Sequence, residues 1–223
     1  MLAGELARLH NVSVDQVLLG DGSGEILKLC AAAFTGKDKK LVIANPTFEA
    51  ITRHAGVANA DVLKIDLMSD YSHDLKKMLA AANGAGLVYI CNPNNPTASI
   101  TPRNEMSEFL ARLSPTTIVL VDEAYHHYVE SKDYESVIPL VKQYPNLIVA
   151  RTFSKIYGMA GLRCGYCVTQ NANIARLKRH QIFDSVNIMA IVAALASLKD
   201  TDHIARGRKL NTEVRKSVCA ELD

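Results

Sequence analysis

The stretch TIVLVDEAYHHY, residues 117–128, decides the fold class. Its first half, TIVLV, is a continuous apolar run rich in β-branched residues, which is typical of a strand buried on both faces of a sheet. A carboxylate, Asp122, follows this run directly. Runs of the same kind recur along the chain, at residues 40–45, 61–66, 86–92, 146–152 and 164–169. Together they predict a parallel or mixed sheet with both faces covered.

Helical patterns separate these predicted strands, at residues 23–35, 46–55, 72–83, 102–113, 134–143 and 171–180. The alternation of strand and helix predicts an α/β protein, a three-layer α/β/α sandwich with a mostly parallel central sheet. The N-terminal MLAGELARLHNVS has an amphipathic helix pattern, and from Ala172 onward the sequence is almost wholly helical.

Composition excludes several classes of protein. The 223 residues are 48% hydrophobic and 22% charged, with a formal net charge of +2 and the two signs mixed. This balance indicates neither a nucleic-acid-binding arm nor a polybasic membrane patch. No apolar run approaches the roughly 20 residues that span a bilayer, and the N-terminus lacks the apolar core of a signal peptide. We therefore expect a cytoplasmic protein with neither nucleic acid nor membrane as a partner.

The cysteines and a histidine pair raise the question of a metal. Five scattered cysteines favour reduced, mostly buried thiols over a disulfide framework. Cys164 and Cys167 form a CxxC, which is also compatible with redox chemistry or half a zinc site, but a zinc site needs four converging ligands. His126 and His127 are adjacent, and adjacent side chains diverge on a strand or loop. We interpret these histidines as solvated or supporting residues, and we predict no metal.

Two loops could hold a ligand by their amides and hydroxyls. GDGSGEIL, residues 20–27, is a glycine-rich turn that opens a helix, so Ser23 and the amides of Gly22, Ser23 and Gly24 could bind an anion. CNPNNPT, residues 91–97, is a rigid loop in which Asn95 is suited to donate a hydrogen bond to a ligand oxygen. Each loop could equally be a simple turn.

Charged residues follow two of the predicted strands. Asp122 leaves a buried strand and needs a cationic or hydrogen-bonding partner, although it could instead cap the next helix. In ARTFSKIYGMAGLRCGY, residues 150–166, burial would destabilise the ammonium of Lys155 and free a nucleophilic amine. Arg163 suits a phosphate, and Thr152 and Ser154 add hydroxyl donors. A ligand with a phosphate, a carbonyl and a basic ring atom satisfies these groups, and pyridoxal 5'-phosphate has all three.

The ordered motifs GDGSGEI, NPTF, NPNNPT, VDEAY and RTFSKIYGMAGLRCGY closely resemble fold-type I pyridoxal-phosphate enzymes. The resemblance is strongest to the histidinol-phosphate aminotransferase branch of class I/II aminotransferases. It implies that Lys155 forms the Schiff base and carries the proton, and that Asp122 pairs with the ring nitrogen. Asn95 and Tyr125 should hydrogen-bond the phenolic oxygen, and Phe48 should stack on the ring where a tyrosine is usual. The remaining site residues should surround the phosphate: Gly22, Ser23, Gly24, Thr152, Ser154 and Arg163.

The resemblance also implies an activity and a domain plan. The activity would be amino-group transfer from an amino acid, such as histidinol phosphate or an aromatic amino acid, to a 2-oxo acid such as 2-oxoglutarate, in a homodimer. Residues 1–190 would be the cofactor-binding large domain, and 191–223 a helical linker toward a small domain that no segment here matches. The same motifs serve related decarboxylases and lyases, and a non-catalytic, cofactor-binding or dimerising short form is a further alternative.

Overall fold

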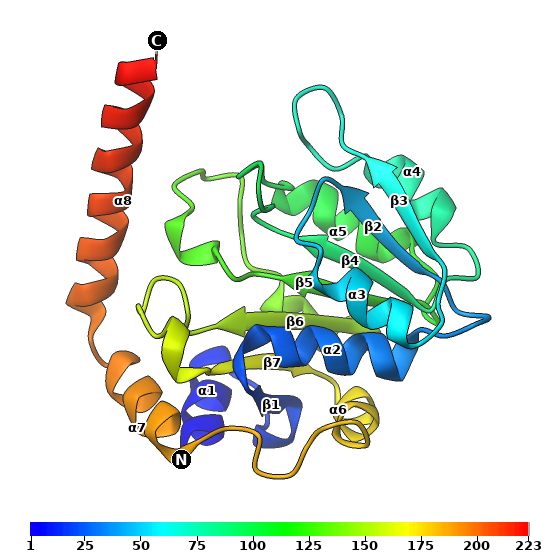
Figure 1. The fold of residues 1–223 in the computed structure, drawn as a ribbon, viewed down its shortest axis with the longest axis horizontal. Coiled ribbons are helices and arrows are strands. Elements are labelled where there is room, and N and C mark those ends of the chain that lie inside the picture. Colours follow the sequence, from blue (N-terminus) through cyan, green and yellow to red (C-terminus); the bar gives the residue numbers. More distant parts are fainter. Residues whose placement is uncertain (223) are drawn as a thin grey trace.

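A seven-stranded sheet forms the middle layer of the computed structural model, which describes residues 1–222 (Figure 1). Its strand order is β1-β7-β6-β5-β4-β2-β3. The strands are β1 (Val17–Gly20), β2 (Leu41–Asn45), β3 (Val62–Asp66), β4 (Leu87–Cys91), β5 (Ile118–Asp122), β6 (Leu147–Thr152) and β7 (Gly165–Thr169). The six predicted strands are confirmed. The sequence reading missed β1, because four residues at the edge of a sheet carry too short a pattern.

Strand direction brings the ends of distant segments together. β7 runs antiparallel to both of its neighbours, β1 and β6, whereas all other neighbouring pairs are parallel. β1 therefore points the same way as β6, and every strand except β7 ends at the same edge of the sheet. The predicted mostly parallel sheet is confirmed, and in such sheets ligands bind at this edge.

Helices cover both faces of the sheet (Figure 1). The α-helices are α1 (Leu2–His10), α2 (Gly22–Phe34), α3 (Ala50–Val57), α4 (Leu75–Ala81), α5 (Arg103–Arg112), α6 (Asn171–Lys178), α7 (Ile188–Ser197) and α8 (Thr201–Leu222). Short 3-10 turns are η1 (Val14–Gln16), η2 (His126–Tyr128), η3 (Ile138–Lys142) and η4 (Ala160–Leu162). The helical C-terminal third is confirmed up to residue 222 except for breaks between α6 and α7 and between α7 and α8, and Asp223 lies outside the described residues.

The helix predicted over residues 134–143 is wrong, since only the 3-10 turn η3 forms there. Pro139 lacks a backbone N–H and lies at the start of this turn. The preceding amide, of Val137, donates to the buried carboxylate of Glu123 at 2.8 Å. The segment therefore binds the Glu123 carboxylate, which follows β5, and does not form the backbone hydrogen bonds of an α-helix.

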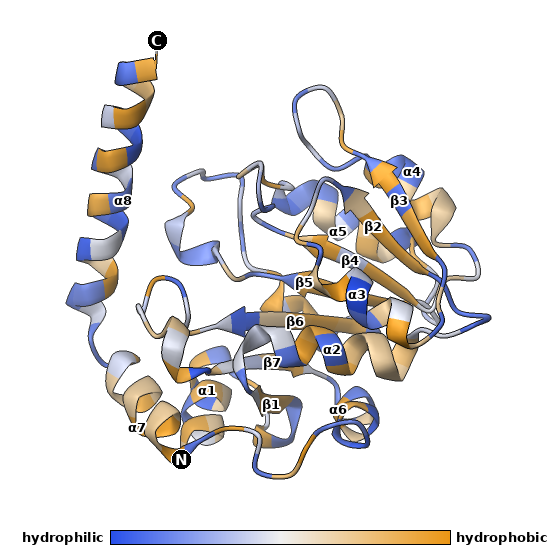
Figure 2. Ribbon diagram, in the orientation of Figure 1, coloured by the Kyte–Doolittle hydropathy of each residue, from blue (hydrophilic) through white to orange (hydrophobic). Residues whose placement is uncertain are grey.

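Two hydrophobic cores separate the three layers. Along β5, Val119 and Val121 pack into one core, and Ile118 and Leu120 pack into the other, as strand alternation requires. α2, α3 and α6 cover the core of Leu120, and α1, α4, α5 and α7 cover the core of Val121. Figure 2 shows β4, β5 and most of β6 in the colours of apolar residues, with a hydrophilic tip at the end of β6. The predicted three-layer sandwich is confirmed.

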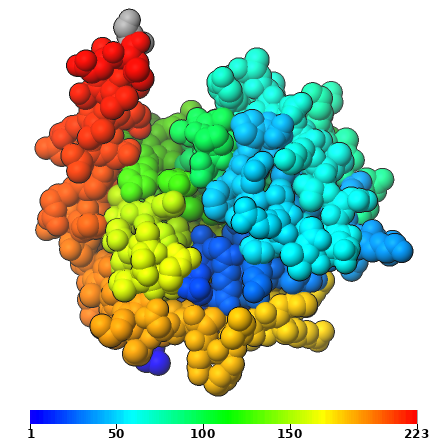
Figure 3. Space-filling model, viewed as in Figure 1, coloured from blue at the N-terminus to red at the C-terminus, as the bar shows by residue number. Residues whose placement is uncertain are grey.

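The last helix, α8, is attached differently from the others. No residue of α8 is buried, and Figure 3 shows its C-terminal end standing out from the body. Its contacts are polar: Arg208 donates to the carbonyl of Val129 at 2.9 Å, and Arg215 pairs with Glu130 at 2.6 Å. The division at residue 190 falls inside α7 and stays a prediction.

Four of the five cysteines, Cys30, Cys91, Cys164 and Cys167, are free and buried, which confirms the prediction of mostly buried thiols. Within residues 1–222, no three His, Cys, Asp or Glu side chains gather in a group that could hold a metal ion. None of the helices in this range is both long and apolar enough to cross a bilayer.

Candidate active site

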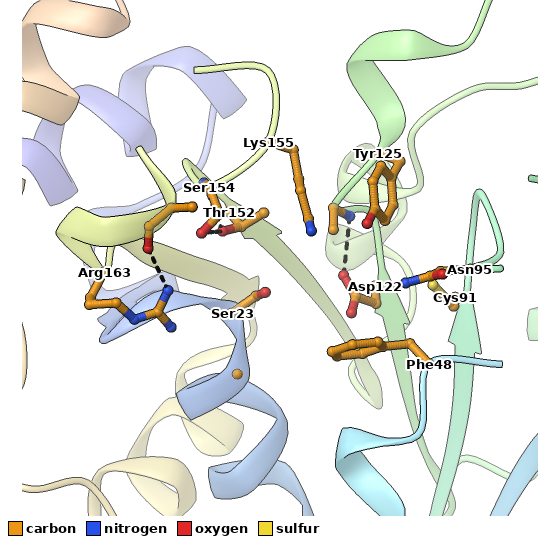
Figure 4. A pocket seen from close by; sticks show the side chains of 13 residues that line it. Ser23, Phe48, Cys91, Asn95, Asp122, Tyr125, Thr152, Ser154, Lys155 and Arg163 are labelled. Atoms are coloured by element: carbon orange, nitrogen blue, oxygen red, sulfur yellow. Dashed lines mark hydrogen bonds between the residues drawn. The ribbon is translucent and has the colours of Figure 1, made fainter. Parts of the chain in front are cut away.

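A pocket of about 240 Å³ opens at the edge of the sheet where β4, β5 and β6 end (Figure 4). It is lined by Ser23, Gly24, Phe48, Cys91, Asn95, Asp122, Ala124, Tyr125, Thr152, Ser154, Lys155, Ala160 and Arg163. Every predicted site residue except Gly22 is among them. The fold therefore gathers side chains that are up to 140 positions apart in the sequence, counted from Ser23 to Arg163.

One end of the pocket is built from the N-terminus of α2. The first amides of a helix have no partner within it and point outward, so this end attracts an anion. Gly22 opens the helix with φ +74°, and a Cβ there would lie 2.3 Å from the guanidinium of Arg163. Gly165, at the start of β7, lets the strand approach the helix, because its Cβ would lie 2.3 Å from the amide nitrogen of Ser23. Two glycines thus set the shape of this end.

Hydroxyl groups and a cation complete the same end. Thr152 donates to the hydroxyl of Ser154 at 2.9 Å, and the amide of Ser154 donates back to Thr152 at 3.1 Å. Arg163 is half exposed, donates to the carbonyl of Ala160 at 2.9 Å, and lies 3.6 Å from the carboxylate of Asp21. Two hydroxyls, helix amides and a guanidinium therefore converge where the sequence predicts a phosphate.

Asp122 lies at the opposite end, fully enclosed at the tip of β5. Its Oδ2 accepts a hydrogen bond from the phenol of Tyr89 at 3.1 Å, and its Oδ1 accepts one from the amide of Ala124 at 3.1 Å. Burial raises the pKa of Asp122 to about 6, and these two donors act in the opposite direction. The expected hydrogen-bonding partners are present. The alternative interpretation is that Asp122 caps the next helix, and the one bond of this kind is that from the amide of Ala124, in the turn after β5.

Lys155 is exposed, so the expected burial of its side chain is wrong. The residue follows the end of β6, where the chain leaves the sheet and its side chain reaches outward over the pocket. Figure 4 shows Lys155 extending between Thr152 and Ser154 on one side and Tyr125 and Asp122 on the other. Its Nζ lies 4.9 Å from the centre of the Tyr125 ring. Its position between the two sides of the pocket is what singles out this amine.

Flat and apolar surfaces line the middle of the pocket. Phe48 is 40% exposed and presents its ring below Asp122 in Figure 4. Cys91, which sequence reasoning missed, ends β4 and is paired in the sheet with Asp122. Its thiol donates to the carbonyl of Pro93 at 3.3 Å, and burial raises its pKa to about 12. The shared strand-end position of Cys91 and Asp122 is the signal that could have found it.

A buried ion pair that the sequence analysis also missed lies behind the pocket. Arg151 donates to Glu123 Oε2 through Nε at 3.0 Å and through its terminal nitrogen at 2.7 Å. Ser136 donates to the same carboxylate at 2.8 Å. Glu123 follows Asp122 and Arg151 precedes Thr152, so this pair joins the two strand ends that carry the site. In the sequence, Glu123 and Arg151 each stand in a long apolar segment, and this pattern could have indicated a buried ion pair.

The histidine pair is half buried, so of the two interpretations, solvated or supporting, the structure favours supporting residues. The rings of His126 and His127 are 3.7 Å apart. Burial lowers the pKa of His127 to about 4 and that of His126 further, and the nearby charge of Arg151 acts in the same direction on both. His127 Nε2 is 3.4 Å from the hydroxyl of Tyr157. The two rings therefore support the loop that follows Tyr125.

The pocket has distinct chemistry at each end and in the middle. At one end, Arg163, the hydroxyls and the helix amides suit a dianion. At the other end, the buried carboxylate of Asp122 suits a protonated ring nitrogen. Between them, the amine of Lys155 suits an aldehyde carbon, and the neighbouring Asn95 amide and Tyr125 phenol suit an adjacent oxygen. The aromatic face of Phe48 suits a ring between these groups. The residues present therefore fit a planar ligand that carries a phosphate, a basic ring nitrogen and an aldehyde.

The fold is that of the three-layer α/β/α proteins that bind a ligand where parallel strands end, and sequence comparison specifies the family. The family model for aminotransferase class I and II matches residues 2–223. The chain belongs to that family.

Several relatives share a single name. The histidinol-phosphate aminotransferase of Shouchella clausii is 38% identical over 208 residues, covering 93% of this chain and 56% of the relative. The histidinol-phosphate aminotransferase of Symbiobacterium thermophilum is 39% identical over 213 residues, which cover 95% of this chain and 58% of the relative. The crystal structure of histidinol-phosphate aminotransferase from Sinorhizobium meliloti in complex with pyridoxal-5'-phosphate matches with a TM-score of 0.90 at 26% identity. The match covers 97% of this chain and 59% of that structure. The chain thus spans somewhat more than half the length of these relatives.

Proposed function

We propose that the chain binds pyridoxal 5'-phosphate through Lys155 and takes part in amino-group transfer between an amino acid and a 2-oxo acid. The observation that carries this proposal is the convergence of Lys155, Asp122 and Arg163 on one pocket, each at a different part of it. The bound cofactor supplies an electron sink for the bond broken at the substrate's α-carbon. The protein supplies orientation, charge and a proton carrier.

Each part of the pocket has a role in this proposal. Arg163, the hydroxyls of Ser23, Thr152 and Ser154, and the amides of Gly22 and Gly24 hold the phosphate. Asp122 keeps the ring nitrogen protonated, and Phe48 stacks on the ring. Asn95 and Tyr125 donate to the phenolic oxygen. The amine of Lys155 would hold the aldehyde carbon and would act as the proton carrier at the substrate's α-carbon.

The substrates we propose are an amino acid or its phosphate ester, of which histidinol phosphate and an aromatic amino acid are the candidates, with a 2-oxo acid such as 2-oxoglutarate as acceptor. Support comes from the relatives' shared name at 38% and 39% identity. A second cavity of about 730 Å³ adjoins the first and shares Asn95, Tyr125 and Lys155 with it. It gives a substrate side chain room beside the reacting amine.

A cofactor titration tests the proposal. Purified chain mixed with pyridoxal phosphate should give a visible absorption band, and borohydride reduction followed by peptide mass spectrometry should find the cofactor on Lys155. Lys155→Ala should give no such band, and Gly56→Ala, a substitution in α3 where nothing lies within 4 Å, should behave as wild type. No band, or label on another lysine, would overturn the cofactor assignment.

Addition of an amino donor separates the reaction classes. For a transferase, histidinol phosphate or an aromatic amino acid should convert the band to the pyridoxamine form, and 2-oxoglutarate should restore it with formation of glutamate. Release of carbon dioxide and an amine would instead indicate a decarboxylase. A band that no donor changes would indicate cofactor binding without turnover by this chain.

We further propose a homodimer. An apolar surface runs along residues 182–192, where Ile182, Phe183, Ile188, Met189 and Val192 are between 57% and 91% exposed. Surfaces of this kind are covered in stable assemblies. Light scattering should give twice the mass of the chain, and Phe183→Ser should shift the population toward monomer. A monomeric wild-type chain at micromolar concentration would contradict the proposal.

A further inference from the structure

We infer that Tyr89 is a positioning residue for Asp122: its phenol holds the carboxylate ionised and oriented, so that Asp122 can keep a ligand's ring nitrogen protonated. The inference rests on the proposed function, because it gives Asp122 its role toward that nitrogen. Tyr89 itself does not line the pocket. It acts through the side chain that does.

The contact is built by neighbouring strands. Tyr89 belongs to β4 and Asp122 to β5, and the two strands are paired in parallel with Cys91 opposite Asp122. Tyr89 is two residues before Cys91, so its side chain lies on the same face of the sheet and reaches along β5 toward its tip. The phenol oxygen is 3.1 Å from Asp122 Oδ2, and Tyr89 is fully buried. A buried phenol of this kind requires a partner, and the carboxylate provides it.

The two hydrogen bonds select one protonation state. The amide of Ala124 donates to Oδ1 at 3.1 Å, and the phenol of Tyr89 donates to Oδ2 at 3.1 Å. A carboxylate accepts both bonds, whereas a protonated carboxyl would turn one oxygen into a donor. Burial raises the pKa of Tyr89 well above its ordinary value, so the phenol keeps its proton. A fixed donor on each oxygen leaves the remaining lone pairs for a third donor in the pocket.

The other groups near Asp122 do not replace Tyr89. Burial raises the pKa of Asp122 to about 6, and the bond from Tyr89 is the largest of the effects that lower it. The Ala124 amide and the charge of Lys155, from the segment after β6, lower it less, and Glu123 raises it. Cys91 faces Asp122 from β4 as a thiol whose own pKa is raised to about 12. Loss of the phenol would therefore make Asp122 harder to ionise.

The experiment compares cofactor affinity over pH 5–9 in wild type, Tyr89→Phe and Tyr166→Phe. Tyr166 is the matched control, because its buried phenol lies 2.9 Å from His10 and not near Asp122. We expect affinity to fall on the acid side in all three proteins. In Tyr89→Phe the pH at which affinity falls should be about one unit higher than in wild type, as expected for the loss of one hydrogen bond to a charged group. Affinity at pH 8.5 should change less than twofold.

A cofactor analogue with carbon in place of the ring nitrogen isolates the contact. It keeps the phosphate and the aldehyde, so wild type and Tyr89→Phe should bind it with the same pH profile. A fluorinated tyrosine placed at position 89 alone is a stronger donor of nearly the same size. It should lower the pH at which cofactor affinity falls. This second replacement keeps the test available if Tyr89→Phe folds poorly.

The outcomes separate the two proposals. If wild type forms no band on Lys155, the proposed function fails. If wild type forms the band but Tyr89→Phe leaves the pH profile in place, only the role of Tyr89 is overturned. An equal shift in Tyr166→Phe, or an equal shift with the analogue, would also overturn it, because the effect would then not pass through Asp122 and the ring nitrogen.

Discussion

The guanidinium of Arg151 lies 2.7 Å from the carboxylate of Glu123, and both side chains are buried on the face of the sheet opposite Asp122. Arg151 alternates with Thr152 along β6, so the ion pair and the pocket occupy opposite faces of the same strand ends. Glu123 also accepts from Ser136 and from the amide of Val137. One cluster thus ties the ends of β5 and β6 to the loop that precedes η3.

Glu123→Gln should destabilise the protein strongly. The substitution leaves the Arg151 charge buried without its partner, which typically costs roughly 3 kcal/mol or more. Urea denaturation at pH 7 measures the loss. Glu135→Gln is the matched control, since Glu135 pairs with Arg103 at the surface and both side chains are more than half exposed, so its removal should cost less than about 1 kcal/mol. Equal losses in the two variants would contradict a special role for the buried pair.

Asp122→Asn should stabilise the cofactor-free protein at alkaline pH. The folded pKa of Asp122 is raised to about 6 from 3.8, so its contribution is complete below pH 3.8 and is lost as the pH rises through 6. Asparagine removes this titration. The stability of the variant relative to wild type should therefore grow between pH 5 and pH 8 by about 1.4 kcal/mol, because the rest of the effect falls below pH 5. Thermal denaturation of both proteins at the two pH values checks this, and a difference that does not change with pH would refute it.

The same substitution should weaken cofactor binding, because an amide cannot hold the ring nitrogen protonated as a carboxylate does. We expect at least a tenfold loss of affinity at pH 8, equivalent to about 1.4 kcal/mol. Absorbance titration with pyridoxal phosphate measures it. Unchanged affinity in a folded variant would remove Asp122 from the proposed site.

His73 should contribute to acid sensitivity of the fold. Its ring is buried, and burial lowers its pKa to about 4 from 6.5. The stabilising contribution of a neutral ring is therefore present above pH 6.5 and is lost as the pH falls toward 4. His73→Asn should reduce the stability loss between pH 7 and pH 5 by roughly 2 kcal/mol. Urea denaturation at both pH values is the measurement.

Thr101→Val is the control for that experiment. Thr101 is hydrogen-bonded to His73 Nδ1 at 2.9 Å, so the variant loses the same bond without removing a titratable group. Its cost should be similar at pH 7 and pH 5. If both variants respond to pH in the same way, the bond and not the proton accounts for the effect.

Gly165→Ala should disturb the phosphate end of the pocket. The new Cβ would lie 2.3 Å from the Ser23 nitrogen and 2.5 Å from the Gly22 carbonyl carbon, which are backbone atoms and must shift. Displacement of the first turn of α2 should lower affinity for pyridoxal phosphate by tenfold or more, about 1.4 kcal/mol. Gly161→Ala, which meets nothing within 4 Å, should bind as wild type. Pyridoxal without its phosphate should bind both variants alike, and a loss there as well would point to general damage.

The motifs of the pocket could be read from the sequence because each is local. A glycine-rich turn before a helix, an asparagine–proline loop and a carboxylate after an apolar run are each contained in a few residues. Their common location followed from one rule, that parallel strands end at the same edge of a sheet. The pocket confirms that Ser23, Asn95, Asp122 and Arg163 come together. Their roles toward a cofactor stay predictions.

Other features depended on which strands are neighbours. Lys155 is exposed although its sequence surroundings are small and apolar, because the chain has already left β6 when it reaches this residue. β1 pairs with β7 although 145 positions separate the paired residues Gly20 and Gly165, and a strand of four residues at the sheet edge carries too short a pattern to predict this contact. The helix predicted at 134–143 is replaced by η3, because the Val137 amide is bonded to Glu123.

The sequence by itself determined the alternation of strands and helices, because apolar periodicity reflects burial of each segment, and it determined which residue types lie at the strand ends. The tertiary structure alone decided the contacts between Tyr89 and Asp122 and between Glu123 and Arg151. Those contacts depend on the order β5 between β4 and β6 and on the parallel register that sets Cys91 beside Asp122 and Asp122 beside Ala150. Register is a relation between segments, and a single segment's pattern of apolar residues does not encode it.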